Sequence, residues 1–170
     1  MKTAIKIEMP VDDEVIKSLS IGDQLEISGN IFCGRDAVLP QIVQLVEEKG
    51  VTSLSVDLHG GAIFHTAVSP AGIGPTTSSK AEIQGTMEAL SKLGIKLHIG
   101  KGALTDETVK MLAALNAIFL VTPPVTALFN NTIVSKRVVA FENEGMEAFF
   151  EVRVKDFPAI VAIAHGQSIF

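Results

Sequence analysis

The first third of the chain shows two kinds of hydrophobic pattern. Asp12 precedes apolar residues at helical spacing, so it is expected to cap a short helix that ends before Gly22. Residues 23–34 then alternate apolar and polar positions, which predicts a strand with a bend at Gly29. This part of the chain therefore predicts a helix followed by a half-buried strand.

A longer amphipathic helix is expected over residues 35–50. Its apolar positions are Val38, Ile42, Leu45 and Val46. Pro40 falls in the first turn, where proline is tolerated, and Gly50 is placed to end the helix.

The remainder of the chain alternates between the two patterns. Further helices are predicted at 79–94, at 104–116 with Thr105 as its N-cap, and at 125–136. Strands are predicted at 52–58, 62–68, 95–100 and 117–121, and strands with turns over 137–146 and 149–166. Strands gather first and then alternate with helices. We therefore expect a single α/β domain, residues 1–170, built in layers around a mixed sheet.

Composition narrows the functional classes. The 170 residues carry a formal net charge of −5, which disfavours nucleic acid as a partner. No run of 18 apolar residues occurs, so no membrane span is expected. Residues 1–14 lack the apolar core of a signal peptide, and a cytoplasmic location is the expectation.

Cysteine and histidine usage limits the metal chemistry. Cys33 is the one cysteine, so the chain cannot form an internal disulfide or hold an iron–sulfur cluster alone, and a buried apolar role is expected. The histidines His59, His65, His98 and His165 show no i, i+4 pairing. A structural role is therefore the simplest interpretation of each.

A run of hydroxyl residues, GPTTSSK at 74–80, stands before a predicted helix. Thr77 or Ser78 could serve as the N-cap, and free backbone N–H groups at a helix start favour an anion. Lys80 adds a positive charge at this end. An ordinary capped helix explains one hydroxyl, but Thr76 remains unexplained by it.

Two further cationic residues are candidates for binding an anion. Arg35 lies near a predicted helix start, where a cation is electrostatically disfavoured, so it needs an anionic partner. That partner could be Asp36, a glutamate or a bound carboxylate, which the arginine fork suits. Lys101 follows a predicted strand, where ligands of α/β sheets collect, although a solvated loop lysine is the plain alternative. Together these residues suggest a small polyanion, such as a dicarboxylate.

Five motifs in order carry a resemblance to a known family. They read GDQLEISGNIFCGRDA, GGAIFHTAVSP, GIGPTTSSK, LHIGKGALTDET and EGMEAFFEVRVKDFPAIVAIAHG. In this order and spacing, from about residue 20 to 168, the chain resembles the β-subunit, or C-terminal domain, of iron–sulfur class I fumarate hydratases and L-tartrate dehydratases.

The resemblance implies a fold and a set of partners. Members of the family fold as a swivelling β/β/α domain and act with an α-subunit whose three cysteines hold a 4Fe–4S cluster. The implied substrate is a C4 hydroxy-diacid, over which the β-subunit closes the pocket. A hetero-oligomer is therefore expected, or a homodimer when the chain is alone.

The resemblance also assigns roles to residues. Arg35 would hold one carboxylate and Lys101 the other end of the diacid. Thr76 would take the place of the proton-abstracting threonine, with Thr77 beside it, and Lys80 would supply a cation one turn further on.

The chain departs from the family pattern at a few positions. Lys80 stands where an arginine is usual, VLPQ follows RDA in place of a histidine and basic residues, and Ala164 replaces a common aspartate. Three functions therefore stay open: a fumarate/malate hydro-lyase subunit, a tartrate dehydratase subunit, and a non-catalytic anion-binding paralogue.

Overall fold

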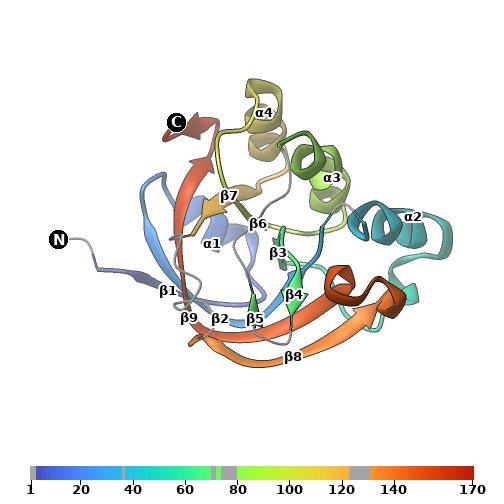
Figure 1. The fold of residues 1–170 in the computed structure, drawn as a ribbon. Helices are drawn as coiled ribbons and strands as arrows, with labels where there is room; N and C mark the ends of the chain where they lie inside the picture. Colours follow the sequence, from blue (N-terminus) through green and yellow to red (C-terminus); the bar gives the residue numbers. More distant parts are fainter. Residues whose placement is uncertain (1–2, 36, 70–71, 74–79, 123–130) are drawn as a thin grey trace.

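The computed structural model describes residues 3–35, 37–69, 72–73, 80–122 and 131–170 (Figure 1). The helical elements are α1 (Asp13–Ser18), α2 (Leu39–Lys49), η1 (Val51–Ser53), α3 (Lys80–Lys92), α4 (Asp106–Ala114) and η2 (Glu142–Glu147). The strands are β1 (Ile5–Glu8), β2 (Gln24–Cys33), β3 (Ala62–Phe64), β4 (Val68–Ser69), β5 (Gly72–Ile73), β6 (Leu97–Gly100), β7 (Ile118–Val121), β8 (Ile133–Ala140), β9 (Phe149–Ala164) and β10 (Gln167–Ser168).

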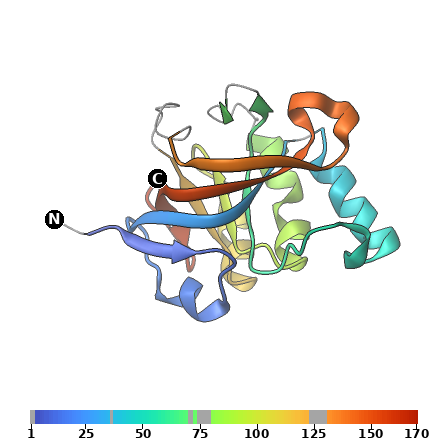
Figure 2. The ribbon, with the colours of Figure 1, turned by 90° about the horizontal axis from the view of Figure 1, so that it is seen from below.

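The main sheet is mixed and closes on itself. Strands β1, β2, β3, β6 and β7 pair in parallel in that order. The long strand β9 runs antiparallel to both β2 and β7, so β2, β3, β6, β7 and β9 form a ring. β8 and β10 add to β9, and Figure 2 shows β8, β9, β2 and β1 crossing the molecule side by side. The predicted mixed sheet is confirmed.

Along the strands, successive residues face alternately the interior of the ring and its outer face. Phe64, Ile99 and Leu120 belong to the main core inside the ring. Their neighbours Ile63 and Phe119 belong to clusters that the helices cover on the outer face. A strand turns successive side chains to opposite faces, so one short strand serves both cores.

Helices α2, α3 and α4 lie together on one side of the ring (Figure 1). Ile42 of α2 and Leu90 of α3 pack with Phe32 and Phe149 in one cluster. Leu112 of α4 belongs to a second cluster, which also holds residues of α3, β7 and β9. The predicted layered α/β domain is therefore confirmed, with the helices stacked on the outer face of the sheet.

Several predicted boundaries are found in the structure. Asp12 caps α1, with its Oδ1 accepting the N–H of Val15 at 2.9 Å, and Thr105 caps α4. Gly50 ends α2 with a φ of 85°, a conformation that favours glycine. The predicted bend in β2 is a register shift between Ile27 and Gly29.

Two predicted elements are wrong. Residues 52–58 form no strand: they contain part of η1, and Leu54 and Leu58 are buried in the cluster that holds α2 and α3. Over 125–136, a helix was expected, yet Ile133 begins β8. The β-branched residues of β8 suit a strand, and pairing with β9 decides their structure. The rest of that expected helix, up to residue 130, lies outside the described residues.

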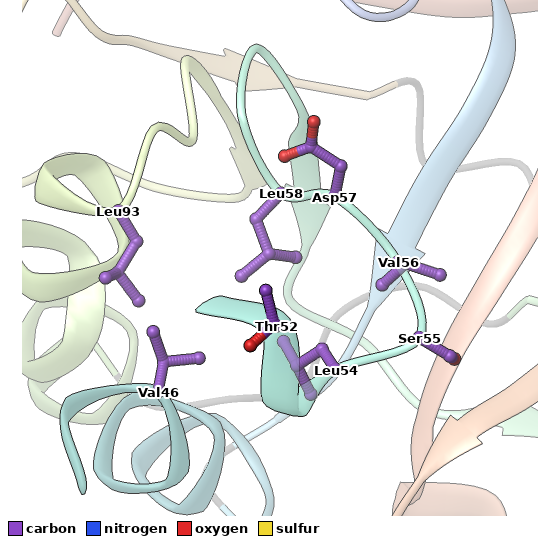
Figure 3. A pocket seen from close by; sticks show the side chains of 8 residues that line it. All are labelled: Val46, Thr52, Leu54, Ser55, Val56, Asp57, Leu58 and Leu93. Atoms are coloured by element: carbon purple, nitrogen blue, oxygen red, sulfur yellow. The ribbon is translucent and has the colours of Figure 1, made fainter. Parts of the chain in front are cut away.

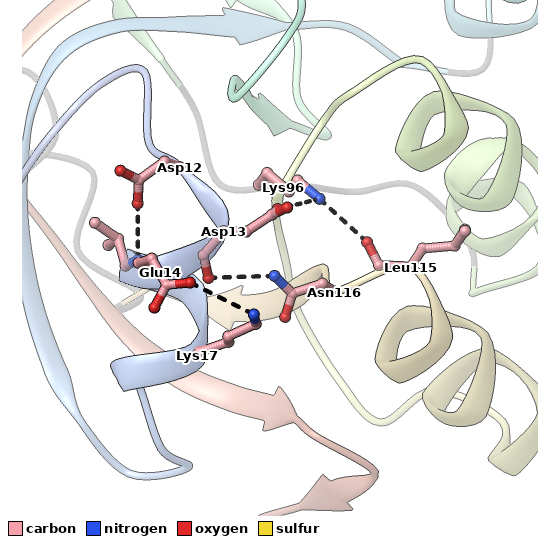
Figure 4. Close-up of polar contacts among 8 residues, drawn as sticks. Asp12, Asp13, Glu14, Lys17, Lys96, Leu115 and Asn116 are labelled. Carbon is pink, nitrogen blue, oxygen red and sulfur yellow. Dashed lines mark hydrogen bonds and ion pairs between the residues drawn. The ribbon is translucent and has the colours of Figure 1, made fainter.

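The amino ends of β6 and β7 are joined to α1 by a polar network (Figure 4). Lys96, just before β6, pairs with Asp13 at 2.8 Å and donates to the carbonyl of Leu115 at 3.2 Å. Asn116, just before β7, donates to the carbonyl of Asp13 at 3.3 Å. This edge of the sheet is therefore fastened by internal contacts.

Within the part of the chain that the structure describes, the helices are too short or too polar to cross a bilayer.

Candidate functional site

The carboxyl ends of the parallel strands lie at one edge of the sheet. Cys33 pairs with Phe64, which pairs with Ile99. Arg35 and Lys101 each follow these positions by two residues, on the strands either side of β3. The register therefore brings two of the predicted cations to the same edge, where ligands of α/β sheets bind.

The backbone before Arg35 is fixed by close packing. The N–H of Gly34 donates to the carbonyl of Phe64 at 3.1 Å. A Cβ at Gly34 would lie 2.9 Å from Leu39 and 3.2 Å from Phe149, so a larger residue would force these side chains to move. The carbonyl of Arg35 accepts the N–H of Leu39 at 2.8 Å as α2 begins. Arg35 is therefore held at the point where β2 passes into α2.

The side chain of Arg35 has an anionic partner inside the chain. Its Nη1 lies 3.1 Å from Oε1 of Glu147, with the two side chains 23% and 39% exposed. Of the partners that the sequence allowed, a glutamate is therefore present. Asp36 lies outside the described residues. Binding of a substrate carboxylate by Arg35 stays a prediction.

Lys101 is exposed in the turn that follows β6, before Gly102 with its φ of 80°. Exposure agrees with the plain interpretation of a loop lysine, and its place at the carboxyl edge agrees with a ligand role. Its part in substrate binding stays a prediction.

Lys80 is the first residue of α3. Because α3 connects the parallel neighbours β3 and β6, it must start at their carboxyl edge, and so must Lys80. The strand order thus brings Arg35, Lys80 and Lys101 to one edge of the sheet. Thr76 and Thr77 lie outside the described residues, and their predicted roles are untested.

Two buried histidines contact each other beside this edge. The sequence did not predict this contact. His65 follows β3, and its Nε2 lies 3.4 Å from Nδ1 of His98 on β6. The Oγ of Ser91 on α3 lies 2.8 Å from the other ring nitrogen of His98. The histidines lie 33 positions apart in the sequence, so no local spacing reveals the contact.

Burial controls the charge of both rings. It lowers the pKa of His65 to about 4 and, with the neighbouring His65, the pKa of His98 well below the ordinary value of 6.5. Both rings are therefore neutral near pH 7, and their role is to join α3 to the ends of β3 and β6. Their burial and contacts agree with the structural role expected from sequence.

The chain does not fit an iron–sulfur cluster of its own. Cys33 is fully buried inside the ring, and burial raises the pKa of its thiol. Such a cluster needs several thiolates, and the sequence holds this one cysteine. Across the described ranges, no three histidine, cysteine or carboxylate side chains gather as a metal site.

An apolar cavity of about 330 Å³ lies at the opposite, amino edge of β3 (Figure 3). Val46 and Leu93 reach it from the carboxyl-terminal ends of α2 and α3, and Leu54 and Leu58 complete its apolar wall. Among the described residues that line it, Asp57 is the one charged side chain, a carboxylate. These lining residues therefore include no cation for a dicarboxylate.

Comparison with known proteins agrees with the resemblance seen in the motifs. The model of the family described as Fumarase C-terminus matches residues 1–170. A "Putative L(+)-tartrate dehydratase subunit beta" of Methanocaldococcus jannaschii is 32% identical over 91% of this chain and 85% of its own length. The "L(+)-tartrate dehydratase subunit beta" of Escherichia coli K12 is 30% identical over 94% of this chain and 83% of its own length.

A longer relative is similar over the same region. The "Putative fumarate hydratase class I" of Geobacillus stearothermophilus is 29% identical over 99% of this chain, which spans 34% of that protein's length. The match over the whole sequence, together with the mixed sheet described above, shows that this chain belongs to the Fumarase C-terminus family.

Proposed function

We propose that this chain is the β-subunit of a hydro-lyase that reversibly adds water to a C4 dicarboxylate, with fumarate and malate as the first candidates. Relatives named as a fumarate hydratase and as tartrate dehydratase β-subunits support the reaction class. The observation that carries the proposal is the row of cations at the carboxyl edge: Arg35 and Lys101 on either side of β3, with Lys80 starting α3.

The chemistry needs cations at this edge. When malate loses water, a proton leaves the carbon beside one carboxylate and the hydroxyl leaves the next carbon, which gives fumarate and water. Negative charge builds on that carboxylate as the proton departs, so cations around it lower the barrier. In the proposal, Arg35 and Lys101 hold the two carboxylates, Lys80 adds charge, and Thr77 contacts the substrate beside Thr76.

Thr76 takes the proton in this proposal. A threonine hydroxyl is a weak base at its ordinary pKa, so it needs an activating neighbour. His65 and His98 are neutral near pH 7 because burial lowers the pKa of each ring. They can therefore support the edge without adding a competing positive charge.

The 4Fe–4S cluster of the proposal belongs to a partner α-subunit. The single buried thiol of Cys33 cannot hold it, and the relatives named as β-subunits imply a second chain. When bound, such a cluster supplies a Lewis acid for the leaving hydroxyl. The expected assembly is a hetero-oligomer in which this chain covers the substrate.

L(+)-tartrate is the second candidate substrate. Relatives named as tartrate dehydratase β-subunits match this chain over 83% and 85% of their own lengths, whereas the fumarate hydratase relative is a much longer protein. The cation row suits either diacid.

The test is co-expression with an α-subunit that carries the cluster cysteines, followed by anaerobic reconstitution and assays on malate, fumarate and L(+)-tartrate. Turnover of one diacid well above the others identifies the substrate, and the chain alone should be inactive. Binding of these diacids without turnover of any would identify a non-catalytic anion-binding paralogue.

A further inference from the structure

The ion pair between Arg35 and Glu147 joins two distant parts of the chain. Arg35 follows β2, whereas Glu147 ends η2, two residues before the first residue of β9. Nη1 of the arginine lies 3.1 Å from Oε1 of the glutamate, and both side chains are partly shielded from solvent. The pair lies at the carboxyl edge because Cys33, two residues before Arg35, ends β2 there.

The backbone on the glutamate side is rigidly held. Ala148 is 1% exposed, and its N–H donates to the carbonyl of Gly145 at 3.1 Å. Phe149 is fully buried and stacks on Phe32, with ring centroids 5.5 Å apart and planes at 12°. Glu147 is therefore anchored two residues before Phe149, which belongs to the helix-covered core.

The same aromatic residue supports the arginine side. A Cβ at Gly34 would lie 3.2 Å from the ring of Phe149, so the backbone before Arg35 packs against the residue that fixes Glu147. Both ends of the ion pair thus rest on one rigid support. Such a pair has a defined direction, in contrast to ion pairs between mobile surface side chains.

A long arginine side chain binds a carboxylate well only when its fork is already oriented. The guanidinium has five N–H donors, so an arginine can pair with more than one carboxylate. Fixing the side chain beforehand removes rotamer entropy that ligand binding would otherwise cost. A glutamate that holds the guanidinium in place can therefore strengthen binding although it carries the same charge as the ligand.

We infer that Glu147 is a positioning residue: it orients Arg35 so that the guanidinium meets a carboxylate of the diacid substrate. This inference rests on the proposed function, in which Arg35 holds that carboxylate. The opposite role for Glu147 is competition, in which it occupies Arg35 and must be displaced. The two roles predict changes of opposite sign, because removing a competitor tightens substrate binding and removing a support weakens it.

The experiment compares Glu147→Ala, Glu147→Gln and Glu144→Gln in the reconstituted complex with its α-subunit. Glu144 is an exposed glutamate of the same segment and serves as the matched control. We expect Glu147→Ala to raise KM for the diacid about fivefold to tenfold with kcat changed less than about twofold, since the lost contact is a partly exposed ion pair. Glu147→Gln keeps an acceptor oxygen and should recover part of the loss, and Glu144→Gln should match the wild type.

A second readout uses the chain without its partner. Phenylglyoxal modification of Arg35, followed by peptide mass spectrometry, should be faster in Glu147→Ala than in the control variant. Melting temperatures of all variants check that the fold is kept. An unchanged modification rate, or a KM that falls in Glu147→Ala, would overturn the positioning role.

Arg35→Ala separates this inference from the proposed function. If Arg35→Ala raises KM strongly while Glu147→Ala leaves it unchanged, the proposed site stands and the positioning role fails. If Arg35→Ala leaves KM unchanged, Arg35 is not the carboxylate clamp and both fail together. If both variants raise KM, and the double variant is no worse than Arg35→Ala, Glu147 acts through Arg35.

Discussion

The lysines at the amino and carboxyl edges of the parallel strands differ in exposure and in their contacts. At the amino edge Lys96 is 13% exposed and is held by the carboxylate of Asp13 and the carbonyl of Leu115. At the carboxyl edge Lys101 is exposed, one residue beyond β6. A cation enclosed by its own fold stabilises that fold, whereas an exposed one can meet a ligand.

The arginine of the carboxyl edge lies between these extremes. Arg35 is partly exposed and pairs with Glu147, so it is supported yet close to solvent. The apolar cavity lies at the amino edge, and the buried pair of His65 and His98 connects α3 with the carboxyl side. The amino edge thus carries a lysine held by internal contacts, whereas the carboxyl edge carries the cations that we propose to bind the substrate.

The largest effect is expected from Thr76→Ala in the reconstituted complex. Loss of the proposed proton acceptor should lower kcat by about 10²-fold to 10⁴-fold, with the melting temperature of the chain unchanged. Thr52→Ala, at the rim of the amino-edge cavity, is the matched control and should keep full activity. Equal activity of the two variants would show that Thr76 does not take the proton. It would also contradict the proposed functional difference between the two edges.

Mild acid should lower the free energy of unfolding, because it protonates His65 beside the carboxyl edge. Burial disfavours the charged ring, so His65 binds its proton near pH 4 in the folded chain and near 6.5 in the unfolded chain. The unfolded state therefore binds more protons in this window, and the free energy of unfolding falls as pH drops. The shift corresponds to about 3 kcal/mol for His65.

Urea unfolding at several pH values between 6.5 and 4 measures this slope. His65→Gln should start from a lower stability and show a flatter dependence on pH, whereas His59→Gln, at an exposed position, should keep the wild-type slope. A wild-type slope retained in His65→Gln would show that His65 does not carry the acid sensitivity.

A smaller effect is expected at the amino edge. Lys96→Met should lower the free energy of unfolding by about 1 kcal/mol, because it removes a charge-assisted hydrogen bond to Leu115 and a partly exposed ion pair. KM and kcat of the complex should not change. A rise in KM as large as that of Lys101→Ala would mean that the two edges are not functionally distinct.

The smallest effect is expected from Asp13→Asn below pH 4. The hydrogen bond and charge of Lys96 lower the pKa of Asp13 from its ordinary value of 3.8, so this carboxylate stabilises the fold above that pH and loses the effect as pH falls further. Asp13→Asn should therefore reduce the dependence of stability on pH only below about pH 4, which is lower than the pH range in which His65 acts. Thermal melting between pH 4.5 and 3 checks this order.

Local pattern predicted much of the fold. The caps at Asp12 and Thr105, the end of α2 at Gly50 and the buried Cys33 all follow from short-range chemistry, and the structure contains them. The same reasoning failed for residues 52–58, where Leu54 and Leu58 support the helices and no strand forms. Periodicity indicates that a side chain is buried but not which layer buries it.

The candidate site, like the fold, was predicted only in part from the sequence. The sequence predicted a cluster of cations and an anionic partner for Arg35 but left that partner open. Glu147 lies more than a hundred positions away, and only the entry of η2 into β9 brings it within 3.1 Å. The contact between His65 and His98 likewise depends on the parallel pairing of β3 and β6.

By itself, the sequence determined the caps, the burial of alternate residues, the charge of the chain and the ordered motifs that mark its family, because each depends on neighbouring residues or composition. Only the tertiary structure decided that β9 closes the ring by pairing with both β2 and β7, that β8 is a strand, and which glutamate meets Arg35. These features depend on pairings between distant segments, whose free energy comes from packing and backbone hydrogen bonds that no local pattern encodes.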